Sequence, residues 1–340
     1  MKQFSYWTAC ILVIALGLVH TPSHAARFKI ATLSPDGSTW MKKMREGAKE
    51  IESRTDKRVK FKFYPGGVMG QDKAVMRKMR VGQLQGGAFS NGTLAATYPG
   101  VQVYNLVMKF KSYEEVDYVR KKMDSLIIQG LEDNGIVALG LSEIGFAYLM
   151  STNPIATVDD LRQQKTWIPE NNIVATHALN AFSVNPIPLP LRDVLVALQT
   201  GMVNTVAGSP IGALTLQWHT KVKYVTDLPL AYIYGVMVLN KDDFDKIKPE
   251  DQAIVREVMG GISAEMDVLN RKDNQAALEA MLNQGITLIE PKPEAVAELK
   301  KLVVTANKNL IASGGLSEDL VKTMDKYLQE FRSQHAQTHD

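Results

Sequence analysis

Residue types that carry out nucleophilic or metal chemistry are scarce in this chain. It contains one cysteine, Cys10, and six histidines, His20, His24, His177, His219, His335 and His339. Only two of these histidines lie outside the first 25 and the last six residues. Two histidines without a recognisable ligand spacing make a poor metal site. We therefore expect no metal ion and no cofactor.

A hydrolytic triad can be drawn from Ser209, His219 and Asp227. The surrounding residues, however, do not form the glycine–x–serine–x–glycine turn that exposes a nucleophilic serine. The chain also lacks a phosphate-binding glycine loop and a His-Glu-x-x-His motif. An enzyme is therefore a rival interpretation, and the sequence favours a protein that does no chemistry on its ligand.

Trp167 is the residue best placed to contact a ligand. It lies in a short predicted strand that ends at Pro169, because proline has no N–H to donate to a sheet. In open α/β sheets, ligands bind in the crevice outside the carboxyl ends of the strands. An indole in that crevice would offer a broad apolar face and one N–H donor. The alternative role for Trp167 is packing between domains.

Nine other residues are candidates for contact with the same ligand. Aromatic, hydroxyl and amide side chains near strand ends make up this set: Trp40, Phe89, Ser90, Asn91, Phe146, Tyr148, Asn171, Ser209 and Tyr234. A few polar groups in an apolar pocket are typical of small-molecule sites. Core packing is the alternative for the aromatic residues, and an ordinary turn is the alternative for residues 89–91.

Strands and helices alternate in the elements that must position these residues. Strands are predicted at 27–32, 59–64, 86–90, 136–141, 146–151, 203–208, 224–227, 232–240 and 286–289. Helical spacing of apolar residues runs between the first three strands, which indicates parallel pairing. A long helical pattern begins at Pro249 and continues to residue 282. Two further helices are predicted to close the chain.

Length, composition and the N-terminal segment limit where the protein works. A chain of 340 residues with 45% hydrophobic residues can form two domains with packed cores. The net charge of +3 is too small to indicate a nucleic-acid partner. An apolar run at 9–19 followed by Ser23-His24-Ala25 predicts a signal peptide over 1–25 and export to the periplasm.

Three segments resemble one family of periplasmic receptors. Residues 161–169, LRQQKTWIP, resemble the DL-x-G-x-K-I-R-V-P segment of DctP-like solute-binding receptors of tripartite ATP-independent periplasmic (TRAP) transporters. Residues 197–210, ALQTGMVNTVAGSP, are similar to that family's ALQ-x-G-x-V-D-G-x-E-x-P. The region 63–92 also looks like the family, so the resemblance covers nearly the whole mature chain.

The resemblance implies an α/β, two-lobed periplasmic-binding-protein fold. Each lobe would be a mostly parallel sheet flanked by helices, with one long helix spanning both lobes. Lobe I would comprise 26–149 and 235–270, lobe II would comprise 150–234 and 271–333, and 334–340 would be a flexible tail. By the same resemblance, the lobes would close on a small ligand and deliver it to TRAP membrane permease subunits, driven by an ion gradient.

Two departures from the family bear on the ligand. Trp167 stands where the family has its carboxylate-binding arginine, and Ala147 stands where a second arginine is common. A carboxylate buried without a cation is unfavourable, so we expect a largely apolar, lipid-like or otherwise atypical ligand. The alternatives are a carboxylate held by other cations such as Arg162 or Lys165, and a periplasmic sensor for a signalling partner.

Overall fold

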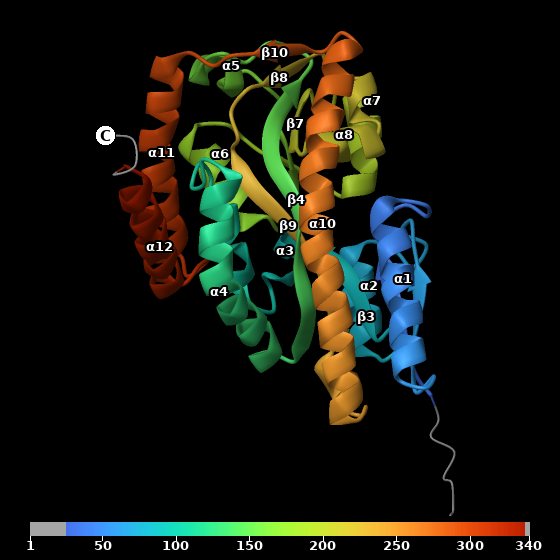
Figure 1. Cartoon of the computed structure of the whole chain (residues 1–340). Coiled ribbons are helices and arrows are strands. Elements are labelled where there is room, and N and C mark those ends of the chain that lie inside the picture. Colours follow the sequence, from blue (N-terminus) through green and yellow to red (C-terminus); the bar gives the residue numbers. More distant parts are fainter. Residues whose placement is uncertain (1–24, 337–340) are drawn as a thin grey trace, which may run out of the picture.

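The computed structural model describes residues 25–336 (Figure 1). Its first part, which begins lobe I, contains β1 (Ala26–Thr32), α1 (Thr39–Arg54), β2 (Val59–Tyr64), α2 (Asp72–Arg80), β3 (Gly86–Ser90), α3 (Asn91–Leu94), η1 (Pro99–Asn105), α4 (Tyr113–Asp133) and β4 (Ile136–Ser151). β1 pairs in parallel with both β2 and β3. The predicted strand–helix alternation of this part is confirmed.

Lobe II follows the crossover of β4. Its elements are α5 (Val158–Arg162), β5 (Trp167–Pro169), α6 (Ile173–Ala181), β6 (Ile187–Leu189), η2 (Leu191–Asp193), α7 (Val194–Thr200), β7 (Thr205–Gly208), α8 (Pro210–Thr215), η3 (Trp218–Thr220) and β8 (Tyr224–Thr226). Local capping fixes several of these short helices. For example, Thr157 and Asp160 form a reciprocal capping box at the start of α5.

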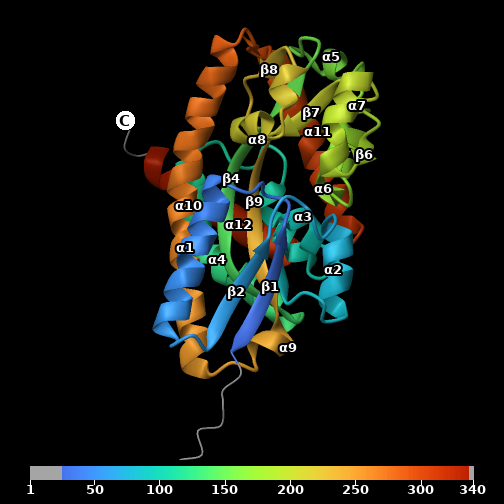
Figure 2. The ribbon, with the colours of Figure 1, turned by 90° about the vertical axis from the view of Figure 1, so that its right-hand side faces the viewer.

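The chain then returns to lobe I and spans both lobes once more. The elements are β9 (Ala231–Asn240), α9 (Lys241–Phe244), α10 (Pro249–Asn283), β10 (Thr287–Ile289), α11 (Pro293–Ala312) and α12 (Glu318–Ala336). α10 is the predicted long helix and has 35 residues. It lies along β4 and contacts α1 of lobe I and α8 of lobe II. Figure 2 shows α1 and α10 on one side of β1 and β2, and α2 on the other.

One mixed sheet connects the lobes. Its strand order is β10-β8-β4-β9-β3-β1-β2, with β7 also paired to β4, and β5 pairs with β6 in a separate two-stranded sheet. β4 and β9 pair antiparallel because they cross between the lobes in opposite directions. The two-lobed α/β class is therefore confirmed, while the description of mostly parallel sheets fails for these two crossing strands.

α12, which the prediction assigns to lobe II, contacts α4. Val321, Met324 and Leu328 of α12 join the same buried cluster as α4, which belongs to lobe I. Arg332 also pairs with the buried Glu115 at 2.7 Å. The C-terminal helix is therefore held by apolar packing and an ion pair against lobe I.

Some predictions fall at the ends of the chain. The signal peptide over 1–25 lies almost entirely outside the described residues, as does most of the tail at 334–340. Within residues 25–336, no helix combines the length and the apolar character needed to cross a membrane.

Candidate functional site

Trp167 lies inside lobe II. Its side chain is 2% exposed, and its ring meets Trp218 edge-on with centroids 5.3 Å apart. The indole Nε1–H donates to the backbone oxygen of Leu189 at 3.0 Å. Both the apolar face and the donor of this residue are thus used within the lobe. In this structure Trp167 is a core residue, and its contact with a ligand stays a prediction.

Three of the aromatic candidates belong to the core of lobe I. Phe89, Phe146 and Tyr234 are between 0% and 5% exposed and share one buried cluster. The Tyr234 hydroxyl donates to the backbone oxygen of Val101. Phe146 packs edge-on against Tyr232, with ring centroids 5.9 Å apart. The structure brings these three residues together, but as packing beneath the surface.

Two polar candidates are used as backbone partners. Ser209 is the N-cap of α8, where its Oγ accepts a hydrogen bond from Gly212 N at 3.2 Å. Asn91 donates from Nδ2 to the backbone oxygen of Val101 at 3.2 Å. Both side chains are buried. Each therefore stabilises its own lobe, and neither presents a free polar group at the surface.

The remaining four candidates keep accessible surface. Ser90 is exposed at the tip of β3, and Asn171 is exposed just beyond β5 in a left-handed conformation with φ of 64°. Trp40 is half-buried beside Phe63. Tyr148 is half-buried on β4 and packs against the cores of both lobes. These four residues retain the freedom to touch a ligand.

Arg162 and Lys165, the two cations that could hold a ligand carboxylate in place of the arginine, already have partners within lobe II. Arg162 pairs with Asp159 at 2.7 Å and with Glu298 at 2.9 Å. Lys165 donates from Nζ to the backbone oxygen of Gly201 at 3.1 Å. Because both are already bonded within lobe II, replacing the absent arginine would require breaking these contacts.

The triad does not assemble. Ser209 Oγ serves as a helix cap, and the Nδ1 of His219 lies 3.2 Å from the backbone oxygen of Ala213. Among the residues that the structure describes, no group of three or more acidic, histidine or cysteine side chains could hold a metal ion. Ser209 and His219 are thus each engaged with backbone groups of lobe II.

Asp72 is a feature that the sequence interpretation missed. It lies in the first turn of α2, where its carboxylate accepts a hydrogen bond from the Thr93 hydroxyl at 2.5 Å. Burial raises the pKa of Asp72, and the Thr93 hydrogen bond opposes that shift only in part. No basic side chain in the described region offsets its charge. A carboxyl group with a shifted pKa is a candidate for a functional role.

Asp72 lies at the boundary between the lobes. The next residue, Lys73, forms an ion pair across that boundary with Glu170 of lobe II at 3.5 Å. Thr93, the partner of Asp72, follows the exposed tip residue Ser90 by one turn of α3. Asp72, Thr93, Ser90 and the loop after β5 therefore form the candidate site.

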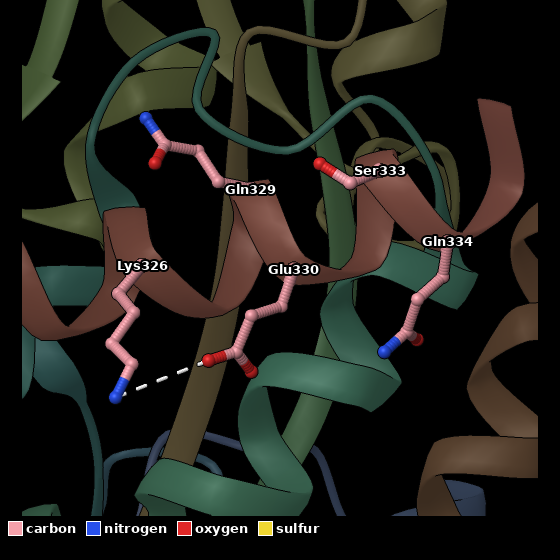
Figure 3. Close-up of a pocket in the computed structure, with 5 residues that line it drawn as sticks. All are labelled: Lys326, Gln329, Glu330, Ser333 and Gln334. Atoms are coloured by element: carbon pink, nitrogen blue, oxygen red, sulfur yellow. Dashed lines mark ion pairs between the residues drawn. The ribbon is translucent and has the colours of Figure 1, made fainter.

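One hollow of the surface lies away from this site. It has a volume of about 470 Å³ and lies over one face of α12, where Lys326 and Glu330 are 4.0 Å apart (Figure 3). Its other lining residues are Gln329, Ser333 and Gln334. A shallow polar face on a single helix lacks the convergent groups of a small-molecule site.

Comparison with known proteins agrees with this fold. The family described as bacterial extracellular solute-binding protein, family 7 (DctP), matches residues 30–313. The chain is 26% identical to the C4-dicarboxylate-binding periplasmic protein DctP of Rhodobacter capsulatus, over 69% of this chain and 71% of that protein.

Solved structures show the same architecture. A TRAP periplasmic solute-binding protein from Sulfitobacter with bound β-D-galacturonate superposes with a TM-score of 0.80 at 20% identity, covering 89% of this chain and 99% of that one. The Bordetella pertussis receptor DctP7, which binds pyroglutamic acid, gives 0.81 at 18% identity, covering 90% of this chain and 100% of that one. Proteins of this family are transport receptors and not enzymes. This chain belongs to the DctP family of bacterial extracellular solute-binding proteins.

Proposed function

We propose that this protein is a periplasmic receptor that captures a small ligand between its lobes and delivers it to a TRAP membrane permease. The family match over residues 30–313 supports the receptor class. Two crossing strands and α10 join the lobes, which is the connection expected of a protein that closes by hinge bending. Export and cleavage after Ala25 belong to the same proposal.

The observation that carries the ligand proposal is Asp72. Its carboxyl group is half-buried, has one hydroxyl partner in Thr93 and lies beside the contact between the lobes. A ligand hydroxyl or ammonium group would supply the missing donor, because hydrogen bonds to a carboxylate are stronger than neutral ones. We infer a small ligand that offers such a donor to Asp72.

The absent arginines define the other half of the ligand proposal. With Trp167 and Ala147 at the two positions, and with Arg162 already paired, a ligand carboxylate would have no preformed cationic partner at these sites. The expectation of a largely apolar or lipid-like ligand drew on these absent arginines and on stacking against the Trp167 indole. A 2% exposed Trp167 offers no such stacking surface in this structure. The ligand we propose is therefore atypical because it binds without the arginine clamp.

Native mass spectrometry of the protein purified from periplasm tests this proposal. We expect one non-covalent small molecule per chain, carrying a hydroxyl or amino group. Asp72→Asn should lose most of that adduct, because an amide presents a weaker acceptor than a carboxylate. Asp319→Asn is a matched control, since Asp319 also lies in the first turn of a helix but is exposed. Equal adduct in both variants, or a simple dicarboxylate such as succinate as the adduct, would contradict the proposal.

A further inference from the structure

A polar stripe on α10 attaches this helix to the crossing strand β4. Asp267, Asn270 and Asn274 recur every three or four residues and therefore share one face of the helix. Asp267 accepts a hydrogen bond from Glu143 N at 2.6 Å, and Asn270 donates to Glu143 O. Asn274 donates from Nδ2 to Ile144 O at 2.7 Å. The stripe thus bonds to the strand backbone where β4 leaves lobe I.

Asn274 differs from the other two because it also contacts lobe II. Its Oδ1 accepts a hydrogen bond from Ile211 N at 3.1 Å, and the side chain is 6% exposed. Ile211 lies in the first turn of α8, two residues after the N-cap Ser209. One carboxamide therefore joins α10, the crossing strand and the start of a lobe II helix.

The first turn of α8 depends on this contact. Pro210 has no N–H to donate, and Gly212 N bonds to Ser209 Oγ. The N–H groups that open a helix have no partner within the helix, so they need side chains, water or a ligand. For Ile211 N the partner is Asn274 Oδ1. Asn274 thereby fixes the backbone that carries Ser209 at the tip of β7.

The strand position facing Asn274 is shaped to receive it. Gly145 has φ of +119°, which residues with a side chain rarely adopt, and a Cβ there would lie 2.5 Å from Asn274 Nδ2. The β4–β9 register shifts between Glu143 and Gly145, and β4 starts to pair with β7 at Tyr148. Irregular pairing and a glycine at the crossover mark a position where the strand can bend.

We propose that Asn274 is a positioning residue that couples bending of β4 near Gly145 to the first turn of α8 in lobe II, at Ser209 and Ile211. This inference rests on the proposed receptor function. When β4 bends, the carboxamide transmits the movement to α8, so that the start of this helix moves together with the hinge. Without it, α8 would move independently of the crossover.

Two measurements without ligand test the coupling. The first is hydrogen exchange of the Ile211 amide, resolved by fragmentation mass spectrometry on the full mature chain. The second is the distance distribution between spin labels at Lys42→Cys in α1 and Gln199→Cys in α7, two exposed sites in opposite lobes. Labelling is selective because the sequence has no cysteine beyond Cys10.

Asn274→Ala should raise the Ile211 exchange rate at least tenfold and broaden the distance distribution. Asn270→Ala is the matched control, because it removes a bond to β4 without touching lobe II. It should leave both readouts near those of the unmodified chain. Equal changes in the two variants, or no change in Asn274→Ala, would overturn the proposal.

A second variant covers the case in which Asn274→Ala does not fold. Asn274→Asp keeps an oxygen acceptor for Ile211 N but loses the donor to Ile144 O. It should retain Ile211 protection and still broaden the distance distribution, and loss of protection would contradict the assigned role of Oδ1. Neither readout needs the ligand, so a negative result for Asn274 leaves the receptor proposal intact. Native mass spectrometry tests that proposal separately.

Discussion

Replacing Trp167 with alanine separates a packing role from a ligand role. The side chain is 2% exposed in a core shared with Trp218, Val206 and Val225. Truncating a buried tryptophan to alanine costs about 3–5 kcal/mol of unfolding free energy, through lost burial and the cavity left behind. The hydrogen bond to Leu189 O adds roughly 1 kcal/mol to that figure. We expect Trp167→Ala to be destabilised by about 4 kcal/mol or more.

Urea unfolding followed by far-ultraviolet circular dichroism measures this loss. Trp167→Phe is the matched control, because it keeps an aromatic ring against Trp218 but removes the N–H donor. It should lose about 1–2 kcal/mol. Comparing the slopes of unfolding free energy against urea shows whether the two-state assumption holds for each variant.

A different pattern would refute the assignment of Trp167 to the core. If Trp167→Ala loses less than about 1 kcal/mol, the ring does not pack as the structure has it. If Trp167→Ala also fails to retain the molecule that copurifies with the unmodified protein, the Trp167 ring contacts the ligand. Full stability loss with the adduct retained in Trp167→Phe supports the core role.

Three further predictions concern the hinge, the lobe boundary and the C-terminal helix. Gly145→Ala should lower the unfolding free energy by about 2 kcal/mol or more, because a φ of +119° is strained for alanine and the new Cβ meets the Asn274 side chain. Chemical denaturation measures this loss. Lys73→Glu should increase the radius of gyration in small-angle scattering, because it repels Glu170 across the boundary, and adding Glu170→Lys should reverse the change. Arg332→Ala should cost about 1–2 kcal/mol at pH 7, discounted for the exposure of the arginine, because it leaves Glu115 buried and unpaired. Burial alone would raise the pKa of Glu115, but Arg332 and the Lys111 N–H lower it. The pair therefore stabilises the fold above pH 4.5, and the effect of Arg332→Ala should shrink as the pH falls below that value.

The fold could be predicted because its signals are local and periodic. The alternation of residues 59–64 and the helical spacing after Pro249 correspond directly to β2 and α10. Ser112 and Glu115 have the spacing of a capping box, and Ser112 does cap α4, although the Glu115 carboxylate bonds to Lys111 N instead of closing the box. Helix boundaries set by caps and prolines are encoded within a few residues, so they can be predicted without knowledge of tertiary contacts.

The direction of side chains in β5 could not be predicted in this way. Trp167 and Ile168 point to opposite faces of a three-residue strand, yet both are buried, with 2% and 5% exposure. Alternation reports which face is buried only when the other face is exposed. Here the position of Trp167 at a strand end suggested a ligand wall, while packing from η3 and β6 determined its surroundings.

Two polar residues differ in how far the sequence encodes their structural roles. Ser209 precedes Pro210, and a serine followed by proline is a common helix start, so its role as a cap was readable from the sequence. Asp72 in a first helical turn has an ordinary explanation in the helix dipole. Its contact with Thr93 joins residues 21 positions apart, and only the folded chain brings them together.

A crystal structure of the protein with its copurified molecule tests the central claim most directly. Our account predicts the molecule between the lobes, with a hydroxyl or ammonium group within hydrogen-bond distance of the Asp72 carboxylate and no contact with the buried Trp167 indole. A molecule bound outside the boundary between the lobes, or one held by its carboxylate with Asp72 untouched, would contradict it.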